Sequence, residues 1–328
     1  MLEARVREAQ TLKRLLDAVK ELVTDANFDC DDEGIRLQAM DNSHVALVSL
    51  KLKSEGFEEY RCDRPMTLGV NIASLTKVIK CAKDDDEVTL SATDQADTIS
   101  LVYNAKASDR VANYELKLMD IDQETLGIPD TEYDATVTLP SAEFARLCRD
   151  LSALGESVKI EVTKDGIRFT SEGDSANGSV LLKAEGSSGG KPVNAGRTKV
   201  KKEEDEDAQM DEDASEDDGG AQGDEEEQEG EEEEGSSKKR KRSKSSAEKA
   251  PKGKAKKARK EDDSETGVTL VMSQQVNLTF SLKYLQNFAK SSSLCNRVTL
   301  SLSNDVPLLV EYNFGQGVIS YFLAPKIE

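Results

Sequence analysis

The residues of this chain that could carry chemistry are few and scattered. It has one histidine, His44, and no Cys-x-x-Cys pair, no Gly-rich phosphate loop and no nucleophile spaced to work with that histidine. An odd number of scattered cysteines favours a reducing compartment. We therefore interpret His44 as a hydrogen-bonded structural residue and expect no enzyme activity, no metal site and no cofactor. The five cysteines are Cys30, Cys62, Cys81, Cys148 and Cys295.

A second kind of chemistry is electrostatic, because basic residues gather on four predicted helices. These helices carry nine basic and four acidic residues, in a chain whose formal net charge is −20. One positive helix would mean little, since exposed helix faces are commonly charged and a late Lys or Arg complements the helix dipole. Four positive helices in an acidic chain favour one basic surface that meets the phosphates of duplex DNA. The nine residues are Lys13, Arg14, Lys20, Lys77, Lys80, Arg146, Arg149, Lys283 and Lys290.

The sequence offers no means of reading bases. It shows no zinc finger, no recognition-helix signature and no aromatic platform interleaved with the basic residues. We therefore expect DNA contact that is not sequence-specific.

An internal duplication supplies the elements that carry the basic residues. Residues 34–36 (Gly-Ile-Arg) recur at 166–168, an offset of 132, and the apolar helix positions upstream keep that offset. Residues 88–91 (Val-Thr-Leu-Ser) recur at 298–301, an offset of 210. A duplication of this length predicts two similar domains, with 78 additional residues inside the second.

Each copy is predicted to run helix, strands, helix, strands. Apolar residues at helical spacing predict helices over 9–23 and 71–82. Alternation and turn residues predict a meander of strands over 27–52. Further strands are predicted at 87–92, 98–104 and 111–118. Two helices that cover one sheet face make an α+β unit, so the predicted fold class is a duplicated α+β domain.

The additional residues form a low-complexity insert at 187–265, with 18 basic and 25 acidic residues. Residues 203–234 hold 20 acidic and no basic residues, whereas 238–260 hold 13 basic and one acidic. Such blocks cannot bury enough apolar area to offset chain entropy, so the insert is predicted to be disordered. The basic clusters 238–242 and 256–260 predict nuclear localisation. A DNA tether, a histone contact through the acidic block and a solvated spacer remain alternatives.

Several blocks outside the insert carry a family resemblance. They are residues 39–45 (AMDNSHV), 54–57 (SEGF), 60–64 (YRCDR), 126–129 (LGIP), 144–151 (FARLCRDL) and 323–328 (LAPKIE). Together they resemble the proliferating cell nuclear antigen family of eukaryotic sliding clamps. The resemblance implies a closed homotrimeric ring, with helices lining the hole and antiparallel sheets outside, which encircles double-stranded DNA as a polymerase processivity factor in the nucleus. The implied domains are 1–117 and 135–328, the second interrupted by 187–265, with a connecting loop at 118–134.

The resemblance also implies a pocket beside the connecting loop. Replication and repair proteins with a glutamine-aliphatic-aromatic-aromatic motif would dock there, and the partners would include the replicative DNA polymerase and the clamp loader. Phe322 replaces the tyrosine usual in the family. By position the pocket residues are Met40, His44, Val45, Leu47, Leu126, Ile128, Pro129, Pro307, Phe322, Leu323, Ala324, Pro325 and Ile327.

Two further sites follow from the resemblance. Lys164 aligns with the lysine that accepts ubiquitin or related modifiers. Head-to-tail subunit contacts are implied between edge strands near 109–117 and 175–183, which heterologous contacts can close into a ring. The interface residues named by position are Asp109, Arg110, Tyr114, Lys117, Ser175, Gly178 and Lys183.

Three other functions are weighed against the clamp. A paired-carboxylate nuclease is disfavoured because the acidic clusters lie in turns and low-complexity sequence. A nuclear acidic chaperone rests on the insert alone. A checkpoint-type clamp subunit, which assembles as a heterotrimer, departs from the blocks quoted above. No apolar run approaches the ~20 residues that span a membrane, so no membrane partner is expected.

Overall fold

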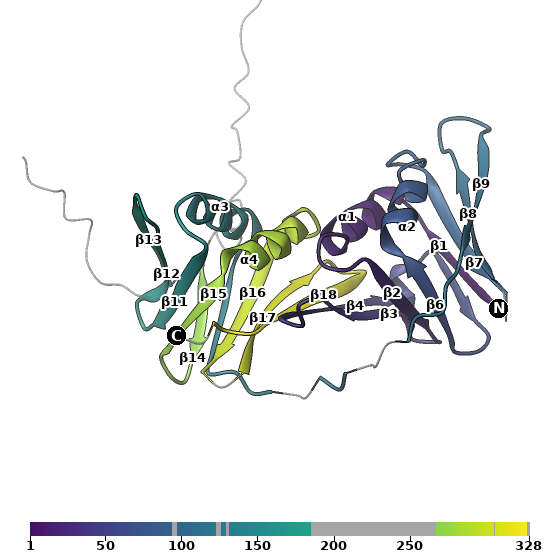
Figure 1. Ribbon diagram of the computed structural model, residues 1–328. Helices are drawn as coiled ribbons and strands as arrows, with labels where there is room; N and C mark the ends of the chain where they lie inside the picture. Colours follow the sequence, from purple (N-terminus) through teal and green to yellow (C-terminus); the bar gives the residue numbers. More distant parts are fainter. Residues whose placement is uncertain (94–96, 123–125, 129–130, 185–266, 305, 327–328) are drawn as a thin grey trace, which may run out of the picture. The chain divides into compact units, whose positions relative to one another are not determined.

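The computed structural model describes residues 1–328 apart from 94–96, 123–125, 129–130, 185–266, 305 and 327–328 (Figure 1). The insert predicted at 187–265 therefore lies outside the described residues. Within the described part of the chain, no helix has the length and apolar character needed to cross a membrane.

The two copies of the repeat have the same order of strands and α-helices and differ in the place of their short 3-10 helices, η1 and η3. The first contains β1 (Leu2–Val6), α1 (Ala9–Val19), β2 (Asp25–Cys30), β3 (Gly34–Met40), β4 (Ala46–Lys53), η1 (Ser54–Gly56), β5 (Glu59–Cys62), β6 (Met66–Asn71), α2 (Ile72–Ile79), β7 (Glu87–Ala92), β8 (Thr98–Asn104) and β9 (Val111–Lys117). The second contains β10 (Ala135–Pro140), α3 (Ser141–Ser152), β11 (Ser157–Thr163), β12 (Gly166–Glu172), β13 (Asn177–Lys183), β14 (Thr269–Met272), β15 (Val276–Ser281), α4 (Leu282–Ala289), η3 (Lys290–Ser293), β16 (Arg297–Ser303), β17 (Val306–Asn313) and β18 (Gly317–Leu323).

The helices and strands confirm the predicted α+β class and differ mainly at their ends. The helix predicted over 9–23 ends at Val19, and the one predicted over 71–82 is shorter at both ends. Asn71 caps the second helix, because its side chain accepts a hydrogen bond from the Ser74 N–H at 2.9 Å. Strands β7 and β8 have the predicted bounds. Strands β1, β5 and β6 have no counterpart in the prediction; β1 and β5, with five and four residues, are too short to show a clear period.

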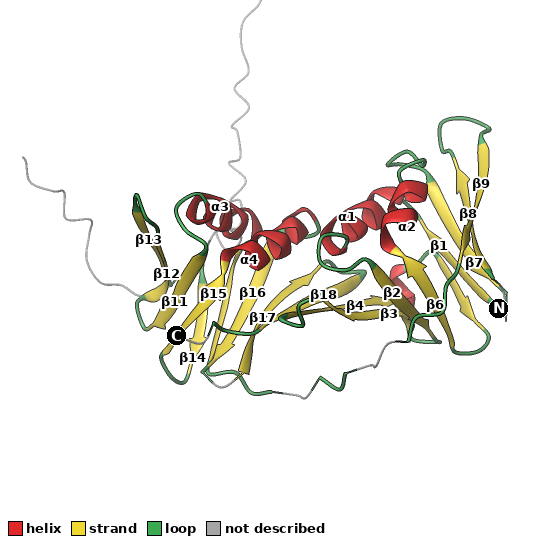
Figure 2. Cartoon of the chain, viewed as in Figure 1, coloured by secondary structure: helices red, strands yellow, loops and turns green. Residues whose placement is uncertain are grey.

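The strands form three antiparallel sheets, and Figure 2 shows the four helices packed on one side of them. The five-stranded sheet has the order β5-β1-β7-β8-β9, and the four-stranded sheet has the order β13-β12-β11-β15. The nine-stranded sheet has the order β14-β10-β16-β17-β18-β4-β3-β2-β6. It therefore combines the second copy's equivalent of the five-stranded sheet with the first copy's equivalent of the four-stranded sheet. The pair β18–β4 is the junction between the two copies.

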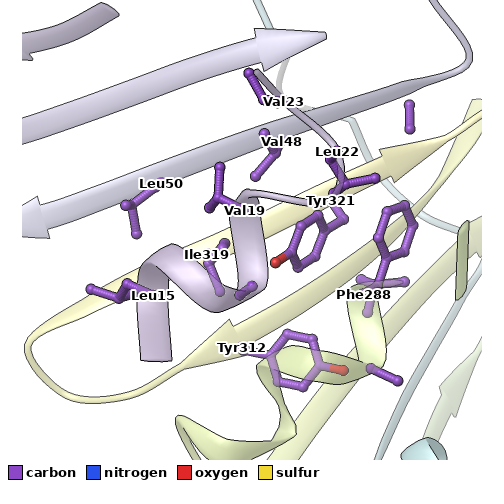
Figure 3. Packing of buried hydrophobic residues seen from close by; sticks show 14 of the residues in the cluster. Leu15, Val19, Leu22, Val23, Val48, Leu50, Phe288, Tyr312, Ile319 and Tyr321 are labelled. Carbon is purple, nitrogen blue, oxygen red and sulfur yellow. The ribbon is translucent and has the colours of Figure 1, made fainter. Parts of the chain in front are cut away.

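The junction is sealed by aromatic packing. Tyr321 lies opposite Val48 across the β18–β4 pair and has no exposed surface. Its ring stacks on Phe288 with centroids 4.5 Å apart and meets Tyr312 edge-on at 6.4 Å. Its hydroxyl is 2.7 Å from the Ser291 hydroxyl. Figure 3 shows Leu15, Val19 and Val48 of the first copy together with Phe288, Tyr312, Ile319 and Tyr321 of the second. The two copies therefore share one apolar core at this junction.

Two strands that correspond to the junction pair remain at sheet edges. Strand β9 is the counterpart of β18, and β13 is the counterpart of β4. Each has one neighbouring strand in the described part of the chain. Tyr114 on β9 contacts Tyr103 with centroids 5.2 Å apart, much as Tyr321 contacts Tyr312. Tyr114 is only partly buried, however, and among the described strands none takes the place beside β9 that β4 takes beside β18. These edges are suited to pairing with another chain.

Candidate functional site

A pocket of about 350 Å³ lies where the connecting segment passes the β18–β4 junction. Strand β3 contributes Met40, and the loop that follows it contributes His44 and Val45. Strands β4 and β18 contribute Leu47 and Phe322, and the connecting segment contributes the opposite wall. The full lining is Met40, His44, Val45, Ala46, Leu47, Leu126, Gly127, Ile128, Thr131, Tyr133, Val306, Pro307, Phe322 and Ala324.

The structure brings together nine of the thirteen residues expected in this pocket. The assignment of Leu323 to the pocket is wrong. Successive side chains of a strand point to opposite faces, so Phe322 faces the pocket and Leu323 is buried in the core. Pro325 is partly buried and does not line the pocket. Pro129 and Ile327 lie outside the described residues. Tyr133 lines the pocket and was not predicted, although an aromatic residue within a connecting segment is a usable signal. Burial raises the pKa of the Tyr133 hydroxyl.

The loop at 41–45, which shapes one rim of the pocket, is organised by the carboxylate of Asp41. Oδ1 accepts hydrogen bonds from the backbone N–H groups of Val45 at 2.9 Å and Ala46 at 2.8 Å. Oδ2 accepts bonds from the N–H of Ser43 at 3.1 Å, from the hydroxyl of Ser43, and from the hydroxyl of Tyr284 at 2.8 Å. Tyr284 belongs to α4, so Asp41 fastens the rim of the pocket to the second copy of the repeat.

The nine predicted basic residues lie on or directly after the four helices, and they differ in how freely their charges project. Lys13 is the least exposed of those in ion pairs, because its ammonium donates to the Ala82 carbonyl and the Asp84 carboxylate, both at 2.7 Å. Arg14 donates to the Ser293 carbonyl at 2.9 Å and so ties α1 to η3. These two residues contribute to packing as well as to charge.

The other basic residues form exposed pairs or none. Lys20 and Lys80 lie 2.6 and 3.9 Å from the carboxylate of Asp17. Such surface pairs are weak, so the ammonium groups can turn toward a phosphate. Lys290 pairs with Glu21 at 3.5 Å, and Arg146 and Arg149 pair with Asp150 at 3.4 and 3.1 Å. Within the described ranges, no carboxylate pair is recorded for Lys77 or Lys283, and both are exposed.

The predicted interface residues gather at the two free sheet edges. Tyr114 and Lys117 lie on β9, with Asp109 and Arg110 in the turn before it. Gly178 and Lys183 lie on β13, and Ser175 precedes that strand. Gly178 sits against the C-terminal end of α3, since a Cβ there would approach Cδ2 of Leu151 to 3.2 Å and Cδ1 of Leu154, just after the helix, to 2.5 Å.

Comparison with known proteins assigns the family. A family model described as "Proliferating cell nuclear antigen, N-terminal domain" matches residues 1–125. A second, described as "Proliferating cell nuclear antigen, C-terminal domain", matches residues 127–203 and 249–327. The chain belongs to the proliferating cell nuclear antigen family. A curated relative from Chaetomium thermophilum, named proliferating cell nuclear antigen, is 44% identical over 328 residues, covering 100% of this chain and 98% of the relative.

Membership of the proliferating cell nuclear antigen family establishes the general function: the protein is a DNA sliding clamp that acts in DNA replication. This result favours the clamp over the nuclease and the acidic chaperone. The C-terminal family model leaves residues 204–248 unmatched, and these residues lie inside the predicted insert.

Lys164 and His44, two residues named from the sequence, are both exposed. Lys164 lies exposed in the turn between β11 and β12, so its ammonium is accessible to a modifying enzyme. His44 has a backbone φ of 57° and its N–H donates to the Asp41 carbonyl at 3.0 Å. Its side chain is exposed at the pocket, which corrects the expectation of a structural, hydrogen-bonded imidazole. No group of three or more His, Cys, Asp or Glu residues is placed to hold a metal ion within the described ranges.

Replacing Asp41 by asparagine is expected to destabilise this clamp in a pH-dependent way. Burial alone would raise the pKa of Asp41, but the hydrogen bonds from Ser43, Ala46 and Tyr284 lower it to about 2. An unfolded Asp has a pKa of about 3.9, so the carboxylate stabilises the fold above pH 4 and loses this effect as the pH falls toward 2. The variant should unfold with a free energy about 1–3 kcal/mol lower at neutral pH, because the buried hydrogen bonds are impaired.

Urea unfolding of both proteins between pH 2.5 and 7 measures this difference. It should shrink below about pH 4, where Asp41 takes up a proton in the unfolded wild-type chain but not yet in the folded one. Asp32→Asn, which changes an exposed carboxylate in the turn at the other end of β3, is the matched control and should show little difference. A difference for Asp41→Asn that stays constant over the whole range would contradict the proposed role of the charge.

Proposed function

We propose that three copies of this chain close head to tail into a ring through pairing of β9 with β13 of the next copy. The observation that carries the proposal is the junction inside the chain. There the counterparts of these two edges, β18 and β4, form an antiparallel pair over a shared apolar core. Each chain contains one such junction and has two free edges, β9 and β13. Three chains in a ring would therefore have three junctions within chains and three between chains, six equivalent junctions in all. The family resemblance supports the number three.

The repeat also predicts the register between chains. Tyr114 lies opposite Leu101 as Tyr321 lies opposite Val310, so Tyr114 and Tyr321 are counterparts. Gly178 lies opposite Ser171 as Val48 lies opposite Ala39, so Gly178 and Val48 are counterparts. Since Tyr321 pairs with Val48, Tyr114 should pair with Gly178 of the next chain.

This register places a pair of opposite charges at one end of the interface. Continuing the antiparallel pairing from Tyr114 opposite Gly178 places Asp109 opposite Lys183 of the next chain. Lys117 would then lie opposite Ser175. Opposite charges that face each other across a strand pair are favourable, whereas like charges would oppose it. The register is therefore supported by charge as well as by the repeat.

The proposed ring explains the basic helices. Twelve helices at 8–10 Å spacing would form a circle of roughly 35 Å diameter. Less a helix radius on each side, this leaves room for a duplex. The nine basic residues would face the phosphates, and topology would retain the ring on DNA with little demand on contact energy. Such a scaffold requires no catalytic step, in keeping with the expectation that the protein is not an enzyme.

We further propose that the pocket holds client proteins of replication and repair. Its volume and largely apolar walls suit the aliphatic and aromatic side chains of a short motif, while a glutamine of the motif would bind polar atoms at the rim. The replicative DNA polymerase and the clamp loader are the expected clients. Lys164 would accept a ubiquitin-type modifier, and the basic clusters at 238–242 and 256–260 would direct the clamp to the nucleus.

Light scattering of the purified protein tests the assembly. A ring of three should have a mass of about 108 kDa, three times the 35.9 kDa of one chain. This value should hold at nanomolar concentration, because a subunit can leave the ring only when both of its junctions are open. A mass equal to one chain under those conditions would overturn the ring and the assignment of the basic helices to its inner face.

A further inference from the structure

The two walls of the client pocket differ in how they are held. One wall is built on strands: Met40 ends β3, Leu47 lies in β4 and Phe322 lies in β18. The other wall is the segment 126–128, which belongs to no helix or strand. Leu126 and Ile128 there keep 39% and 41% of their surface exposed, so apolar burial alone does not fix them. Other interactions must therefore fix the position of segment 126–128 relative to the sheet.

The side chain of Gln38 holds the segment wall. Gln38 is a residue of β3, two positions before Met40. Its Nε2 donates a hydrogen bond to the Leu126 carbonyl at 2.8 Å, and its Oε1 accepts one from the Leu126 N–H at 2.8 Å. The side-chain amide therefore pairs with both backbone groups of Leu126, as a neighbouring strand would. Further fastenings lie upstream, where Asn27 donates to the Ile121 carbonyl at 3.0 Å and the Met119 N–H donates to the Gly69 carbonyl at 2.9 Å.

We propose that Gln38 is a positioning residue for client binding, which pre-orders Leu126 and Ile128 as one wall of the pocket. This inference rests on the proposed role of the pocket. A wall that is already ordered spares the client part of the entropy cost of fixing a loop on binding. Leu126 is held by two short, paired hydrogen bonds whose donor and acceptor both come from one side chain. Removing that side chain releases the backbone at the place where the wall begins.

Two variants separate the roles of the donor and the acceptor. Gln38→Ala removes both hydrogen bonds. Gln38→Glu keeps an acceptor for the Leu126 N–H but sets a carboxylate against the Leu126 carbonyl at neutral pH. When that carboxyl takes up a proton, its O–H becomes a donor to the same carbonyl, and both hydrogen bonds to the Leu126 backbone are restored. Ser49→Ala is the matched control, because Ser49 lies directly opposite Gln38 on β4 and faces the same side of the sheet.

The probe is a synthetic peptide with a glutamine, an aliphatic residue and two aromatic residues, and without acidic residues or histidine. Affinity is measured by fluorescence anisotropy from pH 7.5 to pH 4. Each variant is compared with wild type at the same pH, so that pH effects common to all of the proteins cancel. We expect Gln38→Ala to weaken binding three- to tenfold, mainly through faster dissociation. We expect Gln38→Glu to be weaker than Gln38→Ala at pH 7.5 and to approach wild type at pH 4, below the usual Glu pKa of about 4.3. Ser49→Ala should stay within twofold of wild type.

A second readout needs no peptide. The amide proton of Leu126 should exchange with solvent faster in Gln38→Ala than in wild type, while the thermal midpoint and the solution mass stay unchanged. If Gln38→Ala binds like wild type, or if Gln38→Glu follows the wild-type pH profile, the positioning role is overturned while the pocket stands. If the wild type itself does not bind the peptide, the proposed pocket fails, and the exchange of Leu126 still decides whether Gln38 orders the segment.

Discussion

Replacing Tyr114 by alanine is expected to convert the trimeric clamp into single chains. Tyr321, its counterpart, is fully buried at the junction inside the chain, and Tyr114 should be buried in the same way between chains. Truncating a buried aromatic costs about 3–5 kcal/mol. At 1.4 kcal/mol per tenfold, each junction should weaken more than a hundredfold. Light scattering should report the mass of one chain at micromolar concentration.

The control for this prediction is Glu115→Ala. Glu115 is the next residue of β9 and is exposed, so its side chain points away from the face that carries Tyr114. This variant should remain trimeric. The Tyr114→Ala chains should keep the wild-type far-ultraviolet circular dichroism, because the five-stranded sheet retains its other contacts. Trimers that persist in Tyr114→Ala at nanomolar concentration would show that β9 and β13 are not the assembly edges.

The loss of the ring should also remove the hold on DNA. Separate chains still carry the basic helices, but surface charges alone give weak, salt-sensitive binding. On a circular duplex, loaded wild-type rings should resist a salt wash, and cutting the circle should release them. Tyr114→Ala should wash off both forms. The comparison therefore separates topological retention from electrostatic attraction.

The duplicated architecture could be predicted from the sequence because its signals are local and repeated. Offsets of the Gly-Ile-Arg triplet and of Val-Thr-Leu-Ser located both copies, and strands β7 and β8 have the predicted bounds. The short strands β1 and β5 were missed because five and four residues show little periodicity. Sheet order was not predicted at all, since it depends on pairs such as β18–β4 that lie far apart in the chain.

The pocket, like the fold, could be predicted only in part. Residues of the pocket could be named by family position, yet the position of Leu323 misled because strand alternation decides which side chains face outward. The supports of the pocket had no sequence signal. Gln38 meets Leu126 across 88 residues of chain, and Asp41 meets Tyr284 across 243. Such contacts depend on the assembled sheets and on no spacing within one element.

The basic helix face illustrates what residue type alone leaves open. Nine cations were named together because each lies on or beside a helix. The structure divides them, since Lys13 and Arg14 donate to the backbone carbonyls of Ala82 and Ser293, whereas Lys77 and Lys283 are exposed to solvent. Counting charges finds the surface. Only the hydrogen-bond partners show which members of it are available to DNA.

Replacing Ile128 by alanine is expected to abolish most client binding while leaving the ring intact. Ile128 forms part of the segment wall of the pocket and is 41% exposed, so a client side chain can cover it. Burying an aliphatic side chain contributes about 1.5–3 kcal/mol. At 1.4 kcal/mol per tenfold, the affinity should therefore fall ten- to a hundredfold. Anisotropy with the motif peptide measures the affinity, and light scattering should still report a trimer.

Val271→Ala is the matched control for Ile128→Ala. Val271 is an aliphatic residue of β14, is 69% exposed and lies outside the pocket lining. If apolar character on the surface were enough to attract client motifs, both variants would bind the peptide less well. If the pocket is the docking site, Val271→Ala should bind like wild type, and processive synthesis by a clamp-dependent polymerase should fall only with Ile128→Ala. Equal losses in both variants would mean that the pocket is not the docking site, because both residues are exposed aliphatic side chains and only Ile128 lines the pocket.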